Sequence, residues 1–523
     1  MSIRELENIK PLDEEAMSEA EKRWLSVVKP LFSLGRLEET ITQIAGIKGK
    51  SDFTLDKKAL VIMCADNGVV SEGISQCGSE VTATVAKSFL EKKSTVCIMA
   101  ERANVDILPI DAGMASDVND IPKIKVSYGT KNIATGAAMS REECVTIIKR
   151  SIELVGKLKK DGYDLLLTGE MGIGNTTTAA ASAAVLLEAE AEKVTGKGAG
   201  LDHKRLIKKI NVVKKSIAIN APDPNDPIDI ISKVGGFDIA AMTGLFLGGA
   251  VHRIPVIMDG LISSVAALSA VKMNGYVKNF IIPSHLSNEP AGKMIMNKLG
   301  MEPFLTCGMF LGEGSGAVAV VPVLDMALDV YKKLGTFDKW EHVAYKILRQ
   351  KMDAILIRHG ITNGNIEKRY IGTTDEPLID SEKERLRKNI YPDADIIIIS
   401  PMKRCIQTAE IIYGKYDDIF DGLKECDFGK FENKNYIDLK DDVYYQKWID
   451  SEGKLPFPNG ENMNSFSKRC VSAFDKAVKK YSFAEKIAFI VHGGTIMSIA
   501  EHYLGGEFYD YHLKNGEYMI ISL

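Results

Sequence analysis

Two stretches of the chain alternate short apolar runs with segments of helical pattern. In the first stretch, runs that end in or next to Gly, Asp or other polar residues occupy residues 59–68, 105–113, 163–175, 255–260 and 279–285. Short runs rich in β-branched residues and stopped by glycine are typical of buried strands. Strands separated by helices predict a parallel sheet covered by helices on both faces. Residues 1–50 are predicted to form amphipathic helices, and residues 317–334 a closing strand and helix.

The same alternation begins again at residue 353. Apolar runs at residues 353–360, 394–400 and 486–494 predict a second α/β unit. The charged segment 335–352 between the two stretches is predicted to be a helical connector. We place the boundary near residue 345, which gives domains 1–345 and 346–523. Ligands of open α/β sheets bind at the carboxyl ends of the strands, so the polar residues that end these runs are candidates for chemistry.

Composition narrows the class of protein without changing this picture. A chain of 523 residues with 45% apolar and 26% charged residues is typical of a soluble protein with more than one core. The net charge of −4 gives no reason to expect a nucleic acid or an anionic membrane as partner. No signal-peptide core is visible, and the most apolar stretch, residues 239–251, is too short to span a bilayer. Eight scattered cysteines without a CxxC pair argue against a zinc site and favour a cytoplasmic location.

In the second stretch, the residues that end strands suit phosphoryl transfer. The run 353–360 ends in Arg358-His359-Gly360, and a neutral imidazole can attack phosphorus, so His359 is the candidate nucleophile. Arg358 and Arg404 offer planar forks that match phosphate oxygens. His492, at the end of a later run, is a candidate second cationic or hydrogen-bonding partner.

Four segments in order strengthen this interpretation: residues 357–378, 400–411, 423–432 and 491–494. Together they resemble the histidine phosphatase superfamily, which has the phosphoglycerate mutase-like fold. The resemblance implies a phosphohistidine intermediate, with Asn365 lining the phosphate pocket and Glu425 as the proton donor that later activates water. Asp427 is a rival acid, and His502 and His512 lie outside the motifs and are interpreted as structural. The superfamily includes mutases and phosphatases, and residues 423–432 are more similar to the small phosphatases, notably α-ribazole phosphatase.

The first stretch contains a glycine-rich segment, residues 168–181, between a predicted strand and an alanine-rich helix. Backbone N–H groups at such a helix start can bind a phosphate. No GK[ST] ends this segment and GxGxxG is absent, so neither ATP nor NAD is indicated. The candidate contacts are Gly169, Glu170, Gly172, Gly174 and Asn175. Glu170 also suits a role in holding ribose hydroxyls or favouring an oxocarbenium-like transition state.

Six further segments accompany this loop: residues 65–75, 129–140, 232–244, 255–268, 283–292 and 311–320. With it they resemble the nicotinate-nucleotide–dimethylbenzimidazole phosphoribosyltransferase family over roughly residues 1–345. The resemblance implies a Rossmann-like homodimeric transferase without metal or cofactor. Its substrates would be nicotinate mononucleotide and 5,6-dimethylbenzimidazole or a related base, and its products α-ribazole 5′-phosphate and nicotinate. Glu313 would be the catalytic base, with Gly312 and Gly314 leaving room for a flat aromatic substrate, and Lys209 and Ser287 would contact phosphate or ribose.

Plainer interpretations stay open for single residues. Asp238 and Asp259 end apolar segments and suit helix capping as well as ligand binding. Segment 75–87, near the expected base pocket, departs from the family, so the identity of the base stays open. The leading hypothesis is a bifunctional enzyme that makes α-ribazole 5′-phosphate and then removes its phosphate. The alternative is a general phosphatase or mutase whose first half is a non-catalytic nucleotide-binding regulator.

Overall fold

The computed structural model describes residues 3–198, 200–337, 352–451 and 455–523. The chain divides into two compact units, Met1–Ala344 and Tyr345–Leu523. The predicted boundary near residue 345 and most of the predicted connector 335–352 lie outside the described residues. Among the residues described, no helix combines the length and the apolar character needed to cross a bilayer.

The sheet of the first unit is parallel throughout, with the order β2-β1-β3-β4-β5. Its strands are β1 (Lys58–Ala65), β2 (Asp106–Gly113), β3 (Leu165–Met171), β4 (Val256–Met258) and β5 (Ile281–Pro283), which coincide with the five predicted runs. Along β1, Val61 and Met63 belong to one buried core, while Leu60 and Ile62 belong to the other. Because strands of this kind are buried on both faces, the sequence shows continuous apolar runs instead of alternation.

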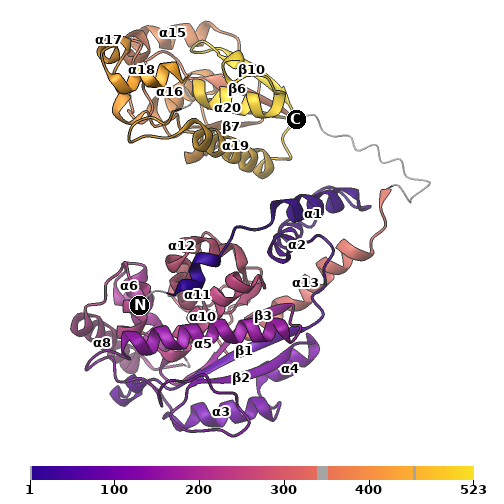
Figure 1. Ribbon diagram of the computed structural model, residues 1–523, viewed down its shortest axis with the longest axis vertical. Helices are drawn as coiled ribbons and strands as arrows, with labels where there is room; N and C mark the ends of the chain where they lie inside the picture. The colour runs from indigo at the N-terminus through magenta and orange to yellow at the C-terminus, as the bar shows by residue number, and fades with distance from the viewer. Residues whose placement is uncertain (1–2, 199, 338–351, 452–454) are drawn as a thin grey trace. The chain divides into compact units, whose positions relative to one another are not determined.

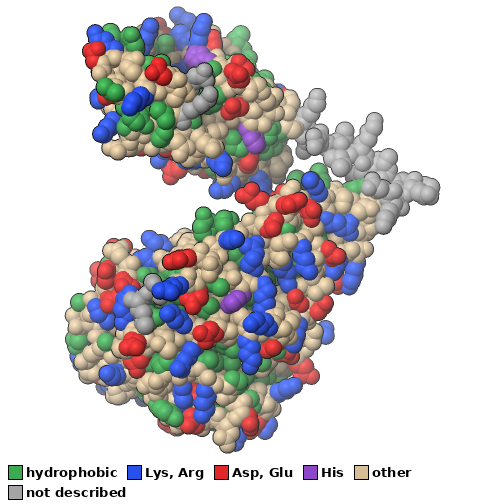
Figure 2. Space-filling view, in the orientation of Figure 1, with side chains coloured by type: hydrophobic (Ala, Val, Ile, Leu, Met, Phe, Trp, Pro, Cys, Tyr) green, Lys and Arg blue, Asp and Glu red, His purple; other side chains and the backbone are tan. Residues whose placement is uncertain are grey.

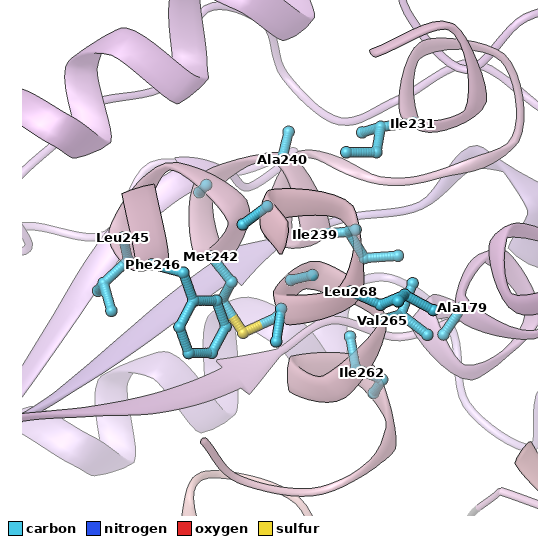
Figure 3. Close-up of a cluster of buried hydrophobic side chains, with 14 of the residues drawn as sticks. Ala179, Ile231, Ile239, Ala240, Met242, Leu245, Phe246, Ile262, Val265 and Leu268 are labelled. Carbon is cyan, nitrogen blue, oxygen red and sulfur yellow. The ribbon is translucent and has the colours of Figure 1, made fainter. Parts of the chain in front are cut away.

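Helices cover both faces of this sheet (Figure 1). They are α1 (Glu14–Ser26), α2 (Arg36–Lys48), α3 (Glu80–Leu90), α4 (Thr95–Arg102), α5 (Arg141–Lys160), α6 (Asn175–Leu186), α7 (Ala191–Val194), α8 (His203–Asn220), α9 (Pro227–Val234), α10 (Phe237–His252), α11 (Leu261–Met273), α12 (Ala291–Leu299) and α13 (Ser315–Lys333). The apolar stretch noted in the sequence is α10, which packs against α5 and α11 and is buried along almost its whole length. Figure 3 shows Met242 and Phe246 of α10 in this core together with Val265 and Leu268 of α11. Acidic and basic side chains are interspersed on the visible face of the unit (Figure 2), in keeping with the small net charge.

The strand predicted within residues 317–334 is wrong, because Ser315–Lys333 is one helix, α13. Its start is stabilised by Asp259, whose Oδ1 accepts hydrogen bonds from the backbone N–H groups of Gly316 (2.9 Å) and Ala317 (3.0 Å). Val318, Val320 and Val321 are buried in the second core. Valines that face different sides of a buried helix imitate the pattern of a buried strand, and tertiary packing overrides their strand propensity.

The second unit has the strand order β10-β6-β9-β7-β8, in which β10 is antiparallel to β6 and the other pairs are parallel. Its strands are β6 (Asp353–Arg358), β7 (Ile396–Ile399), β8 (Asp418–Ile419), β9 (Lys486–Val491) and β10 (Tyr518–Ser522). Its helices are α14 (Asn363–Ile366), α15 (Asp380–Lys388), α16 (Lys403–Tyr413), α17 (Tyr436–Leu439), α18 (Val443–Asp450), α19 (Met463–Lys480) and α20 (Gly493–Leu504). The predicted fold class, two mainly parallel sheets flanked by helices, is confirmed. Since β6, β9 and β7 are neighbours, the residues that follow them meet at one edge of the sheet.

Candidate active sites

The first unit has a cavity of about 610 Å3 at the carboxyl ends of its central strands. Glu170 from the end of β3, Asp259 after β4 and Ser287 after β5 all line it. Glu313, from the loop before α13, closes another part of the wall. Parallel strand order therefore brings together residues that lie far apart in the sequence, as expected for this edge of the sheet.

The glycine-rich loop forms one wall of this cavity. Gly174 has a left-handed backbone (φ 92°) and precedes α6, whose first residues Asn175 and Thr176 line the cavity. A Cβ atom on Gly172 would lie 2.3 Å from the carbonyl oxygen of Ala65, so only glycine fits there. The start of α6 thus lies at the cavity wall, where the positive end of the helix dipole favours an anion.

Glu170 is a buried carboxyl in an acidic neighbourhood. Burial raises its pKa to about 8, and the nearby charges of Asp238 and Asp259 contribute to this rise. The side chain of Asn175 donates a hydrogen bond to Glu170. Gly312 (φ 85°) passes so close that a Cβ atom there would lie 2.6 Å from Oε1 of Glu170. At neutral pH this carboxyl is mostly protonated until a positive charge approaches it.

Glu313 has two features of a functional residue. Its backbone is left-handed (φ 59°), which is strained for a residue with a side chain. Its Oε2 atom is buried without a hydrogen-bond partner in the described structure. Burial raises the pKa of Glu313, while hydrogen bonds from the Val96 backbone and the Ser94 hydroxyl lower it. Gly169 lets this loop approach β3, because a Cβ atom on Gly169 would lie 2.7 Å from the carbonyl oxygen of Glu313.

Lys209 and Ser287 differ in how directly they reach the cavity. Ser287 lines it, whereas Lys209 lies behind the wall and donates hydrogen bonds to Thr176 Oγ1 (2.8 Å) and Gly196 O (3.1 Å). Burial lowers the pKa of Lys209 to about 8. Lys209 therefore holds a cavity residue, and the predicted direct contact with phosphate would require its side chain to change partners.

Three remaining residues of the first site have structural contacts as well. Asp259 caps α13, which matches the capping interpretation. Asp238 lies within the first turn of α10, after the N-cap Gly236, and its Oδ1 accepts from the backbone N–H of the next residue, Ile239 (2.9 Å). Burial raises the pKa of Asp238 to about 6. Gly314 (φ 89°) precedes α13, and a Cβ atom there would lie 2.3 Å from Leu60 Cδ1. The bonds from Asp259 fix the start of α13 next to the loop that carries Glu313.

In the second unit, His359 and His492 face each other, with ring centroids 5.1 Å apart. His359 Nδ1 lies 2.7 Å from the carbonyl oxygen of Gly360, so Nδ1 carries the proton and Nε2 keeps its lone pair. The Nε–H of Arg404 donates to His492 Nδ1 (3.3 Å), so His492 donates through Nε2 to Ser400 Oγ (2.7 Å). Burial, reinforced by Arg404, lowers the pKa of both histidines well below the ordinary value. His359 is thus a neutral imidazole whose Nε2 has a lone pair, as the predicted role of nucleophile requires, and His492 fits a hydrogen-bonding role better than a cationic one.

The two candidate arginines are held by backbone carbonyl groups. Arg404, buried, donates from Nη1 to Thr374 O (2.7 Å) and from Nη2 to Gly372 O (3.0 Å). Arg358 donates from Nη1 to Leu513 O (2.6 Å), while its Nε is buried without a hydrogen-bond partner among the described atoms. A buried donor without an acceptor beside His359 suits a phosphate oxygen.

His512 and Asn365 complete the surroundings of the histidine pair. His512, interpreted above as structural, places Nε2 3.3 Å from Arg358 Nη1. Asn365 Oδ1 accepts from the Thr362 backbone N–H (3.1 Å) and so caps α14. It also accepts from Asn515 Nδ2 (3.1 Å), a donor that reaches the carbonyl oxygen of His359 as well (3.0 Å).

Of the two rival acids, only Glu425 lies beside the histidines. Its Oε2 accepts from the backbone N–H of Gly494 (3.1 Å), two residues after His492. Burial raises the pKa of Glu425. Asp427 instead caps a turn, since its Oδ1 accepts from the Gly429 N–H (2.8 Å). A second cavity, of about 390 Å3, opens next to Glu425.

Sequence reasoning missed two polar side chains of the second unit that contact candidate residues. Asn515, just before β10, contacts the His359 segment, and Arg469, on α19, contacts the Glu425 segment. Neither belongs to a recognised motif, and neither ends an apolar run. Strand β10 was not predicted from the sequence. A strand predicted there would have pointed to Asn515, because this residue lies just before it.

Comparison with known proteins gives a family for each unit. Residues 9–341 match the family model described as phosphoribosyltransferase, and residues 354–523 match the model of the histidine phosphatase superfamily, branch 1. The nicotinate-nucleotide–dimethylbenzimidazole phosphoribosyltransferase of Ruminiclostridium cellulolyticum is 48% identical over 346 residues, which cover 66% of this chain and 98% of that protein. The protein of the same name from Acetivibrio thermocellus is 48% identical over 340 residues, covering 65% of this chain and 97% of that one.

Solved structures match each of the two units. The crystal structure of CobT from Thermus thermophilus matches with a TM-score of 0.59 and 34% identity, and covers 62% of this chain and 98% of that chain. The α-ribazole phosphatase of Shigella flexneri matches with a TM-score of 0.30 and 23% identity, covering 32% of this chain and 89% of that chain. The second match carries no argument about a substrate.

Proposed function

The chain belongs to the phosphoribosyltransferase family and carries a histidine phosphatase domain, and from this we propose that it catalyses two consecutive steps of cobalamin lower-ligand assembly. The first unit transfers phosphoribose from nicotinate mononucleotide to 5,6-dimethylbenzimidazole or a related base, giving α-ribazole 5′-phosphate and nicotinate. The second unit hydrolyses the phosphate and releases α-ribazole. One observation carries the proposal: the transferase product is a phosphomonoester, and the second unit has the His359 site of a phosphomonoester hydrolase.

In the proposed transfer, a benzimidazole nitrogen attacks the anomeric carbon and forms the new C–N bond. The bond to nicotinate breaks, and its electron pair returns to the cationic ring nitrogen. Glu313 takes the proton from the other benzimidazole nitrogen. The raised pKa of Glu313 makes it a stronger base than an ordinary glutamate. Glu170 borders the same cavity, and the positive charge of the nicotinate ring would favour its ionised form.

The phosphoribose end is assigned to the glycine-rich loop. The first turn of α6, with Asn175 and Thr176, suits the 5′-phosphate, and Ser287 suits a phosphate or ribose oxygen. Lys209 supports this wall through its bond to Thr176. Gly169, Gly172, Gly174, Gly312 and Gly314 contribute by letting backbone segments approach closely.

In the proposed hydrolysis, Nε2 of His359 attacks phosphorus while the bond to the sugar oxygen breaks. Arg358 and Arg404 stabilise the negative charge on the phosphoryl oxygens, and neutral His492 joins them by turning its Nε2–H from Ser400 to a phosphoryl oxygen. Glu425 gives its proton to the departing sugar oxygen, for which a raised pKa is suited. Water then attacks the phosphohistidine, Glu425 takes the proton from the water, and inorganic phosphate leaves.

The proposal is tested by giving the full chain nicotinate mononucleotide and 5,6-dimethylbenzimidazole and following the products by mass spectrometry. We expect nicotinate, inorganic phosphate and α-ribazole. His359→Ala should accumulate α-ribazole 5′-phosphate at the parent rate of nicotinate release. Glu313→Gln should slow nicotinate release but still hydrolyse added α-ribazole 5′-phosphate. Accumulation of the 5′-phosphate by the parent chain would refute the two-step assignment, and no nicotinate release from the parent chain would refute it in favour of the regulator alternative. Loss of nicotinate release in His359→Ala alone would contradict independent action of the two units.

We extend the proposal to organisation and location. The domains would be residues 1–345 and 346–523, the first forming the contact of a homodimer, and the reaction would take place in the cytoplasm. All eight cysteines are free in the structure, as suits a reducing compartment. Analytical ultracentrifugation that gave the mass of one chain at micromolar concentration would contradict the dimer.

A further inference from the structure

The candidate proton donor of the second unit sits on a segment without regular secondary structure. Residues 424–428 connect two short 3₁₀ turns, Asp421–Leu423 and Gly429–Phe431. Glu425 is tied to the segment that follows His492 by a hydrogen bond from the Gly494 backbone N–H to its Oε2. Its other recorded bond is local, from the Cys426 N–H to Oε1 (3.0 Å). Something outside the segment must hold Glu425 where a leaving oxygen would be.

Arg469, on α19, makes that connection. Its Nη1 donates to the carbonyl oxygens of Gly422 (2.9 Å) and Lys424 (3.0 Å). Its Nη2 donates to the carbonyl oxygen of Glu425 itself (3.3 Å). One guanidinium therefore joins three carbonyl groups around the proton donor to a helix of the second unit.

Glu461 binds the guanidinium of Arg469 and also binds the backbone of Asp427, on the other side of Glu425. It accepts from Arg469 Nε through Oε1 (2.9 Å) and from Nη2 through Oε2 (2.6 Å), the bidentate geometry of a strong pair. Its Oε2 also accepts from the Asp427 backbone N–H (3.1 Å), and its own N–H donates to Asp427 O (2.9 Å). The pair thus spans residues 422–427.

The hydrogen bonds of Arg469 indicate that this residue positions the segment and does not bind phosphate. A guanidinium has five N–H groups. The five bonds above, two to Glu461 and three to carbonyl groups, use all of them. Arg358 differs, because its Nε is buried without a partner in the described structure. Arg469 lines the cavity beside Glu425, but its N–H groups are already committed to the protein.

We propose that Arg469 and Glu461 are positioning residues that hold Glu425 in register for proton transfer to the leaving oxygen. The proposal rests on the phosphatase function proposed above. Neither residue touches the phosphoryl group. Their loss should therefore impair departure of a basic leaving group more than attack by His359.

Leaving-group dependence is the test. An alkyl phosphate such as α-ribazole 5′-phosphate or ribose 5-phosphate needs a proton on its departing oxygen, whereas p-nitrophenyl phosphate releases a weakly basic phenolate that does not. In the full chain, Arg469→Ala should lower kcat/KM, which reports the transfer to His359 and not the later hydrolysis, about 10- to 100-fold for the alkyl phosphate, as expected for a misplaced catalytic group. It should lower kcat/KM for p-nitrophenyl phosphate less than about threefold. Glu425→Gln should show the same selectivity, and Arg469→Lys, which keeps the charge but not the fork, an intermediate one.

The pH profile gives a second readout. Burial raises the pKa of Glu425, so a loosened, better solvated carboxyl should return toward its ordinary pKa. The basic limb of the alkyl phosphate profile should then move to lower pH in Arg469→Lys. Lys480→Ala is the matched control, since Lys480 lies on the same helix but pairs with Asp418 (2.7 Å) at the exposed surface. It should behave as the parent chain.

The outcomes separate the two proposals. If the parent chain hydrolyses neither phosphate, the proposed phosphatase function is wrong. A parent chain active on both, with Arg469→Ala and Arg469→Lys equally slow on both or unchanged on both, would overturn the positioning role alone. If Arg469→Ala turns over neither phosphate, the decision rests on Arg469→Lys and Glu461→Gln, whose retained p-nitrophenyl phosphate activity reports an intact His359 site.

Discussion

Gly312→Ala tests the close approach of the loop that carries Glu313 to the carboxyl group of Glu170 in the transferase cavity. Gly312 has φ 85°, and a Cβ atom there would lie 2.6 Å from Oε1 of Glu170. An ordinary contact begins at 3.4 Å, so the carboxyl must move by about 0.8 Å. Such a shift disturbs the hydrogen bond that the Asn175 side chain donates to Oε2 of the same carboxyl.

The expected magnitude has a backbone part and a catalytic part. A left-handed alanine costs about 1–2 kcal/mol, and the stiffer unfolded chain offsets about 0.4–1 kcal/mol of this. A net loss of about 1 kcal/mol lowers the Tm by only a few degrees in a unit of this size. A displacement near 1 Å at the reacting centre reduces rate by up to about 100-fold. We therefore expect kcat/KM of the transferase to fall roughly 10- to 100-fold, about 1.4–2.8 kcal/mol of transition-state stabilisation.

The assay is nicotinate release at fixed base concentration, with phosphatase activity of the same chain as the measure of active protein. Gly49→Ala is the matched control, because Gly49 also has a left-handed backbone (φ 68°) but its Cβ atom would meet only an ordinary contact, 3.5 Å from Asp13 Oδ2. It should lose similar stability and keep its rate. Equal rates for Gly312→Ala and Gly49→Ala would refute the role given to the Glu170 contact.

Three further predictions follow from buried ionisable groups. Glu313→Gln should lower transferase kcat about 100-fold or more. In the parent chain the rate should rise with pH through a pKa above the ordinary glutamate value of 4.5, because the base must be ionised. A pH–rate profile that is flat across the acidic range would contradict this prediction. Lys209→Met removes the donor to Thr176 and should raise the KM for nicotinate mononucleotide roughly 10-fold with little change in kcat. An unchanged KM in steady-state kinetics would contradict this role of Lys209. Because burial lowers the pKa of His359 and His492, the unfolded chain binds more protons below the ordinary value of 6.5, so the unfolding temperature of the second unit should fall as pH drops through and below that value. Calorimetry should show a weaker dependence in His492→Gln, and a transition independent of pH would exclude the linkage.

Much of the fold could be predicted because fully buried parallel strands leave a continuous apolar signal. The runs that contain β1 and β6 are of this kind, and their ends identify the edge where ligands bind. The short β8 and the edge strand β10 carry no such signal, since β10 has exposed and buried positions mixed. Part of the helix α13 has the pattern of a strand because its valines are buried on several sides.

The sequence by itself determined two α/β units, the glycine-rich loop and the strand-end residues Glu170, His359 and His492. It could do so because burial and turn geometry restrict residue types locally. Only the tertiary structure showed that Glu425 bonds to the segment after His492 while Asp427 caps a turn, placed Lys209 behind the cavity wall, and brought Arg469 to the segment of Glu425. These outcomes depend on hydrogen bonds between residues far apart in the chain, and a polar residue in a surface helix has the same sequence pattern whether or not such a partner lies opposite it.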